Sequence, residues 1–177
     1  GKAGFWDAGK IVSSRSCQVG YEGKPLDSRQ TLYWKTMVWD EEGEVSPWSE
    51  TGRWTMGLLK PSDWEARWIG NREDCYPDST LTGPAPYFRK TFCINKPVKQ
   101  AKVYICGLGF YEMYLNGERV GDQVLAPAVT NFDRRSLNKM LYFFDDYSAR
   151  RVIYYTFDVT PLVPEAATTV GVLLGNG

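Results

Sequence analysis

The dipeptide Asn116-Gly117 constrains the fold of this chain more than any other feature of its sequence. It separates two strand-like runs, residues 110–115 and 118–120. Asn and Gly both accept the positive φ angles of a type I′ turn, so Asn-Gly between such runs is the strongest short-range signal of a β-hairpin. The pattern predicts a hairpin centred on residues 116 and 117, and therefore a domain built on β-sheet.

Further strand-like runs occur along the chain, and turn-forming residues separate them. They are residues 30–39, 50–56, 88–94, 99–106, 154–159 and 169–174. Aromatic and β-branched side chains suit a pleated, half-buried surface, and aromatic residues make up 15% of the chain. No segment with helical periodicity exceeds about three turns. We therefore expect an all-β fold.

The distribution of these runs predicts two β-sandwich-type regions, residues 1–57 and 87–177, with a junction at 58–86. A length of 177 residues suits one or two small domains. In the junction we expect a short helical turn with Ser62 as its N-cap, followed by a polar loop rich in Pro and Gly. We also expect Trp64 and Trp68 to be at least partly buried, because each offers a large apolar area.

Composition excludes several functional classes. The chain contains no histidine, which rules out a Ser-His-Asp triad and any His-liganded metal site within it. Lys plus Arg and Asp plus Glu both number 21, so charge gives no reason to expect a nucleic acid or an anionic membrane as partner. The longest apolar runs fall far short of the roughly 20 residues that span a bilayer.

The cysteines show no metal-binding spacing. Cys93 and Cys106 lie in strand-like runs, where free cysteine usually behaves as a small buried apolar residue. A disulfide among Cys17, Cys75, Cys93 and Cys106 stays an open alternative, so cysteine usage leaves the cellular compartment undecided.

Short motifs in a fixed order connect the chain to a known family. The first region contains Trp6-Asp7-Ala8-Gly9, Tyr33-Trp34 and Pro47-Trp48-Ser49, and the second contains Leu115-Asn116-Gly117-Glu118-Arg119-Val120-Gly121 and Phe157-Asp158-Val159-Thr160. In this order they resemble the N-terminal region of bacterial α-L-rhamnosidases of glycoside hydrolase family 78. The resemblance implies a fibronectin-III-like domain followed by a jelly-roll-like β-sandwich, both incomplete at the ends of this chain.

The resemblance also implies a function. Family members carry their catalytic carboxylates in a large downstream helical barrel, so we expect this chain to be a non-catalytic accessory region of a secreted or periplasmic bacterial enzyme that hydrolyses terminal α-L-rhamnose. The expected partners are a rhamnose-containing carbohydrate and the barrel of the same polypeptide. Two alternatives stay open, namely a purely structural spacer and a stand-alone binding module. Carboxylate pairs such as Glu41-Glu42 are interpreted as solvated turn residues, and no catalytic residue is assigned.

Candidate binding residues surround the predicted hairpin. Strand alternation places Tyr111, Met113 and Leu115 on one face, which we expect to be core, and Glu112 and Tyr114 on the other. The candidates for sugar contact are Tyr114, Glu112 and Trp64.

Calcium is a candidate cofactor. In some relatives β-sandwich modules bind rhamnose with the help of calcium, a hard cation that takes about six to eight oxygen ligands. The residues that would offer oxygens here are Asn116, Asp122, Asn131 and Asp133. Taken alone, these residue types fit turn and surface roles as well.

Overall fold

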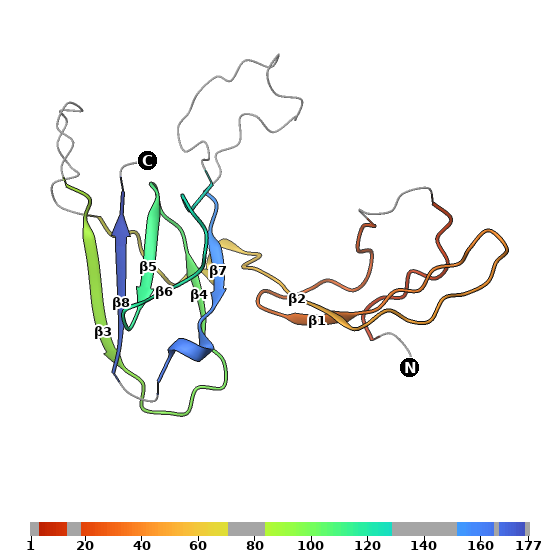
Figure 1. The fold of residues 1–177 in the computed structure, drawn as a ribbon, viewed down its shortest axis with the longest axis horizontal. Coiled ribbons are helices and arrows are strands. Elements are labelled where there is room, and N and C mark those ends of the chain that lie inside the picture. The colour runs from red at the N-terminus through yellow and green to blue at the C-terminus, as the bar shows by residue number, and fades with distance from the viewer. Residues whose placement is uncertain (1–3, 14–18, 71–83, 129–151, 165–166, 176–177) are drawn as a thin grey trace, which may run out of the picture. The chain divides into compact units, whose positions relative to one another are not determined.

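The computed structural model describes residues 4–13, 19–70, 84–128, 152–164 and 167–175. The chain divides into two compact units, residues 1–68 and 69–177, and both contain antiparallel sheets (Figure 1). In the described residues, helical structure is limited to short 3-10 turns, so the predicted all-β fold is confirmed. None of the described helices is long and apolar enough to cross a bilayer.

The first unit is built on a two-stranded sheet. β1 (Thr31–Trp34) pairs with β2 (Gly52–Thr55). The strand predicted over 30–39 is shorter, because beyond Trp34 side-chain hydroxyls replace part of the backbone ladder. Ser49 Oγ accepts from the Thr36 N–H at 3.0 Å, and Ser46 Oγ accepts from the Val38 N–H at 3.0 Å. Pro47 lies between these serines and has no N–H to offer a ladder.

A 3-10 turn, η1 (Pro61–Asp63), follows β2 in the first unit. Its N-cap is Lys60, so the prediction of Ser62 as the cap is wrong. Proline favours the first helical position, and this shifts the start of the turn ahead of Ser62. The Asp63 carboxylate accepts from the Lys60 N–H at 2.8 Å and from the Ser28 hydroxyl. Ser28 in turn accepts from the Leu59 N–H at 2.8 Å.

These contacts predict a pH response of the turn. The Ser28 hydroxyl, followed by the Lys60 N–H, lowers the pKa of Asp63 below its ordinary value. A lowered folded-state pKa means that the stabilisation is present above the ordinary pKa and is lost as the pH falls through the folded pKa. We expect an NMR titration to place the Asp63 midpoint below that of free Asp, and Ser28→Ala to raise it. Thr31→Ala is the control and should leave it unchanged; an unchanged midpoint in Ser28→Ala would contradict this account.

The two junction tryptophans differ in exposure. Trp64, directly after η1, is half-buried as expected. Trp68 is 64% exposed, so the expectation of burial is wrong for this residue. Residues 65–70 are all exposed, and this stretch therefore provides no apolar cover for the Trp68 indole.

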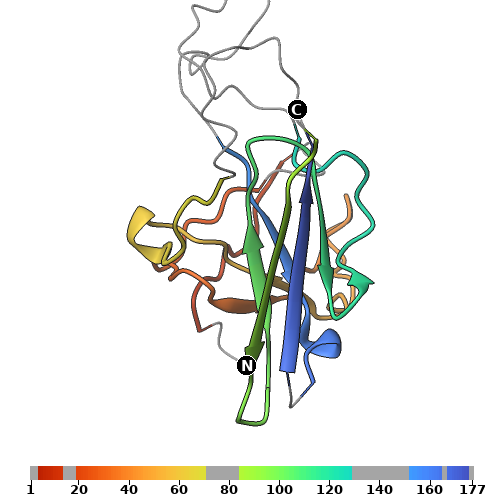
Figure 2. The ribbon, with the colours of Figure 1, turned by 90° about the vertical axis from the view of Figure 1, so that its left-hand side faces the viewer.

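The second unit contains two sheets that pack face to face. The larger has the order β3-β8-β5-β6 and the smaller pairs β4 with β7. In Figure 2 the dark blue β8 lies in front of the lighter blue β7, which shows the sheets as separate layers. The strands are β3 (Tyr87–Cys93), β4 (Lys102–Ile105), β5 (Tyr111–Leu115), β6 (Glu118–Arg119), β7 (Tyr155–Asp158) and β8 (Ala167–Leu174).

The core of the second unit lies between these sheets. Tyr111, Met113 and Leu115 of β5 are buried at 7%, 4% and 3% exposure, which confirms the face predicted as core. Partly buried side chains from β4, β7 and β8 pack against them; these include Val103, Ile105, Phe157, Val170 and Val172. One face of β5 is thereby committed to the core, and its other face points away from it.

The predicted hairpin is confirmed and is tied to the rest of the unit. Asn116 and Gly117 have φ angles of 52° and 89°, as a type I′ turn requires. The Asn116 side-chain amide donates from Nδ2 to the Leu162 carbonyl at 2.9 Å, and its Oδ1 accepts from the Thr169 N–H at 2.8 Å. Leu162 ends a second 3-10 turn, η4 (Thr160–Leu162). Asn116 therefore joins the hairpin to β8 and to η4.

Candidate functional site

The larger sheet of the second unit has an outer face that carries a mixed group of side chains. Cross-strand partners share a face, so the register places Tyr87, Leu173 and Glu112 in one row, and Arg89, Gly171 and Tyr114 in the next. β6 adds Arg119 opposite Tyr114. We call this group the outer-face cluster; its members are Tyr87, Arg89, Glu112, Tyr114, Arg119, Gly171 and Leu173.

Three members of the outer-face cluster contact one another. The Tyr114 hydroxyl donates to Glu112 Oε2 at 2.7 Å. Arg119 Nη2 lies 3.4 Å from Glu112 Oε1 and donates to the Gln123 carbonyl at 2.7 Å. The side chains of Arg119 and Glu112 are 40% and 43% exposed. Polar groups of both signs are therefore held in place and open to water.

The protonation state of Tyr114 follows from the same contacts. The hydrogen bond to Glu112 raises the pKa of Tyr114, desolvation and the Glu112 charge raise it further, and Arg119 opposes them. The side chain therefore stays a neutral phenol at pH 7 and donates to the carboxylate. This arrangement offers hydrogen-bond donors and acceptors for a ligand, together with an aromatic ring.

The structure locates two of the four predicted calcium ligands. The Asn116 side-chain oxygen and nitrogen are both hydrogen-bonded to backbone groups. Asp122 is exposed. Asn131 and Asp133 lie outside the described residues. Within the part of the chain that is described, no group of three or more His, Cys, Asp or Glu side chains is placed to hold a metal ion. The calcium site stays a prediction.

The predicted sugar-contact residues fall in different units. Glu112 and Tyr114 belong to the second unit and contact each other. Trp64 belongs to the first unit. The structure thus brings together two of the three candidates on one sheet face, and sugar contact itself stays a prediction.

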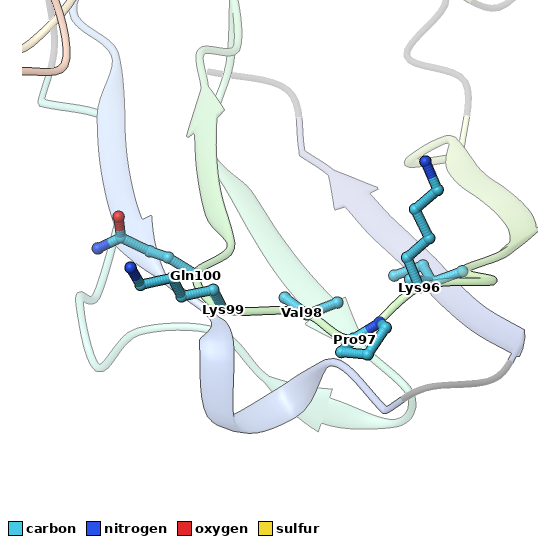
Figure 3. A pocket seen from close by; sticks show the side chains of 6 residues that line it. Lys96, Pro97, Val98, Lys99 and Gln100 are labelled. Carbon is cyan, nitrogen blue, oxygen red and sulfur yellow. The ribbon is translucent and has the colours of Figure 1, made fainter.

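A hollow in the second unit offers little for recognition. It is lined by six residues of one continuous stretch between β3 and β4, shown in Figure 3: Ile94, Lys96, Pro97, Val98, Lys99 and Gln100. The side chain of Lys96 points away from those of Lys99 and Gln100. Because the lining comes from a single loop and the Lys96 side chain diverges from those of Lys99 and Gln100, the hollow offers no convergent set of polar groups.

The two described cysteines are free thiols, and neither is fully buried. Cys106 is half-buried, and burial raises the pKa of its thiol. Cys93 is exposed, so its prediction as a buried apolar residue is wrong. Its register opposite Ala167 places it on the same outer side of the edge strand β3 as Tyr87 and Arg89. Cys17 and Cys75 lie outside the described residues.

Part of the outer-face cluster does not follow from the sequence patterns, namely Tyr87, Arg89, Arg119, Gly171 and Leu173. Strand alternation assigns each to one of two faces of its own strand. It does not say that β3 and β5 both pair with β8. A hairpin register could have identified Arg119, because Tyr114 lies opposite it across the Asn-Gly turn.

Two families match the chain in the order of its two units. Residues 1–60 match the family described as "Rha78A-like, N-terminal immunoglobulin domain". Residues 96–145 match the family described as "Alpha-L-rhamnosidase N-terminal domain". The first description specifies an immunoglobulin domain, so the fibronectin-III-like part of the expectation stays a prediction.

Curated and solved relatives agree with these matches. An α-L-rhamnosidase of Formosa agariphila is 38% identical over 99% of this chain and 18% of its own length. The solved α-L-rhamnosidase of "Dictyoglumus thermophilum" is 36% identical with a TM-score of 0.79, over 98% of this chain and 19% of that one. That of Aspergillus terreus is 29% identical with a TM-score of 0.72, over 93% and 17%.

The chain thus spans less than a fifth of the length of these relatives, while the match extends over nearly all of the chain itself. Both matching families are described as N-terminal domains, and the description of the second names α-L-rhamnosidase. On the agreement of family models, sequence and fold, this chain corresponds to the N-terminal region of α-L-rhamnosidases.

Proposed function

We propose that the chain is the non-catalytic N-terminal accessory region of a bacterial enzyme that hydrolyses terminal α-L-rhamnose from glycans or glycosides. One observation carries the proposal: 38% identity to an α-L-rhamnosidase runs over 99% of this chain but over only 18% of that relative. Most of the relative's length, with room for the expected catalytic barrel, lies outside the matched part. The barrel of the same polypeptide is therefore the proposed partner of the chain.

The outer-face cluster does not suit the catalysis of glycoside cleavage. Glycoside hydrolysis needs two carboxyl groups, roughly 5–5.5 Å apart for retention or roughly 6.5–9.5 Å apart for inversion. Glu112 is the one carboxylate of the cluster, and it is already bonded to Tyr114 and Arg119. A carboxylate held in this way fits ligand binding better than proton transfer.

The finer part of the proposal is that the chain helps to recognise the rhamnose-containing carbohydrate. The exposed polar and aromatic groups around Glu112 and Tyr114 support this role. A spacer without sugar binding is the competing function, and titration with L-rhamnose separates the two. A secreted or periplasmic location of the whole enzyme is also part of the proposal and rests on the family resemblance.

The first test concerns catalysis. We expect the purified 177-residue chain to release no aglycone from an aryl α-L-rhamnoside above the buffer background, because the proposed catalytic carboxylates belong to another part of the polypeptide. A chromogenic assay measures this directly. The full-length product of the same gene is the positive control and should hydrolyse the substrate. Turnover by the chain alone would overturn its non-catalytic role, and an inactive full-length product would overturn the rhamnosidase assignment.

A further inference from the structure

We propose that the outer-face cluster is a binding site for a pyranose ring of a rhamnose-bearing saccharide, and that this site works without a metal ion. The inference rests on the proposed function and gives it a location on the larger sheet. It adds Tyr87, Arg89, Arg119, Gly171 and Leu173 to the residues that sequence alone suggested. The open position at Gly171, the polar groups of the sheet face and its balance of charge support this ligand.

Because Gly171 has no side chain, the register leaves an open position between Arg89 and Tyr114, which we call the slot. Gly171 lies between Arg89 and Tyr114 in the pairing register. A Cβ built on Gly171 would meet nothing closer than the Phe88 carbonyl oxygen at 4.0 Å, so the position is open. Arg89 and Tyr114 are two strand spacings apart, which is about 10 Å. That width admits one sugar ring between two side chains that stand up from the sheet.

The polar groups beside the slot suit a pair of neighbouring hydroxyls. Glu112 supplies carboxylate oxygens that accept hydrogen bonds, and the Arg119 guanidinium next to it supplies N–H donors. Both are held before any ligand arrives, since Tyr114 is bonded to Glu112, and Arg119 is bonded to the Gln123 carbonyl. Preorganisation of this kind lowers the entropic cost of binding. The charged pair can meet hydroxyls directly, so the site needs no cation as intermediary.

An aromatic side chain completes the site. Tyr87 lies in the row next to Arg89 and Tyr114 and is 80% exposed. A tyrosine ring offers an apolar face with a polar tip, which suits the apolar face and hydroxyl rim of a pyranose. Half-buried Leu173 lies between Tyr87 and Glu112 in that row and adds apolar surface to the floor.

The balance of charge favours a saccharide over a protein partner. Cores of protein interfaces are depleted of charged residues. This face instead carries three charged side chains, Arg89, Glu112 and Arg119, and its apolar surface is limited to the row that contains Tyr87 and Leu173. Both signs of charge are present and the chain has no net charge, which gives a polyanion no electrostatic advantage. A neutral ligand rich in hydroxyls fits this mixture.

The test is an NMR titration of the 177-residue chain with L-rhamnose and with an α-L-rhamnosyl disaccharide, in the presence of EDTA. We expect saturable amide shifts at β8 and β5 around Gly171 and Tyr114. We expect Tyr87→Ala and Glu112→Gln each to weaken binding by roughly tenfold, because each removes one main contact. Gly171→Val should fill the slot and abolish binding, with amide spectra that show whether the sheet is retained.

Glu118→Gln is the matched control. Glu118 lies on the same hairpin, opposite Leu115, and is exposed, so the change removes an equal charge outside the cluster and should leave affinity unchanged. Absence of saturable shifts, loss of binding in EDTA, or shifts confined to residues outside the sheet would each overturn the proposal. Shifts that depend on protein concentration instead of sugar would identify a second copy as the occupant and would also overturn it. An inactive full-length enzyme would overturn the proposed function while leaving this binding result intact.

Discussion

Leu115→Ala is expected to lower the free energy of unfolding of the second unit by about 2 to 5 kcal/mol, the range for removing a buried leucine side chain. Leu115 is 3% exposed and belongs to the cluster of buried residues between the two sheets. Its loss removes apolar contacts and leaves a cavity in the core at the end of β5, directly before the hairpin turn. Small domains are stable by only about 5–15 kcal/mol, so the change is a large fraction of the total.

Tryptophan placement makes the effect measurable unit by unit. All seven tryptophans of the chain lie within residues 1–68, so tryptophan fluorescence during urea unfolding reports the first unit. Amide hydrogen exchange of β5 and β8 reports the second. We expect Leu115→Ala to accelerate exchange in β5 and β8, while the exposed control Glu118→Ala changes stability by no more than about 0.5 kcal/mol. Equal protection of β5 in both variants would contradict the role of Leu115 in the core.

Asn116→Ala should also destabilise the second unit strongly, by about 2 to 4 kcal/mol. The side chain makes one hydrogen bond to the Leu162 carbonyl and one from the Thr169 N–H, each with a net contribution of about 1 kcal/mol. The residue also adopts a φ of 52°, a left-handed conformation that costs roughly 1–2 kcal/mol for an ordinary L-residue. Urea unfolding monitored by circular dichroism gives the size of the loss.

Asn116→Gly separates the two contributions. Glycine keeps the positive φ without strain but removes both side-chain hydrogen bonds. We therefore expect Asn116→Gly to be about 1 kcal/mol less destabilising than Asn116→Ala, with faster exchange of the Thr169 amide in both variants. Identical stabilities would show that the backbone conformation contributes nothing here, and an unchanged Thr169 amide would show that the side chain does not hold β8.

Local patterns predicted the parts of the fold that depend on neighbouring residues. The Asn116-Gly117 turn and the buried set Tyr111, Met113 and Leu115 follow from turn chemistry and from the period of two along a strand. Two of the errors lie in the junction, outside the strands and the hairpin turn. Pro61 moved the start of η1 ahead of Ser62, and exposed neighbours left Trp68 without cover.

The sequence by itself determined that this chain forms strands, where the hairpin turns, and which side chains of β5 enter the core. Only the tertiary structure decided that β8 lies between β3 and β5, and so brings Tyr87, Gly171 and Glu112 onto one surface. The reason is that alternation marks two faces on each strand but carries no information about which strands pair. A slip of one residue in register would exchange the faces, and burial of Met113 and Leu115 against the opposite sheet selects the register that is observed.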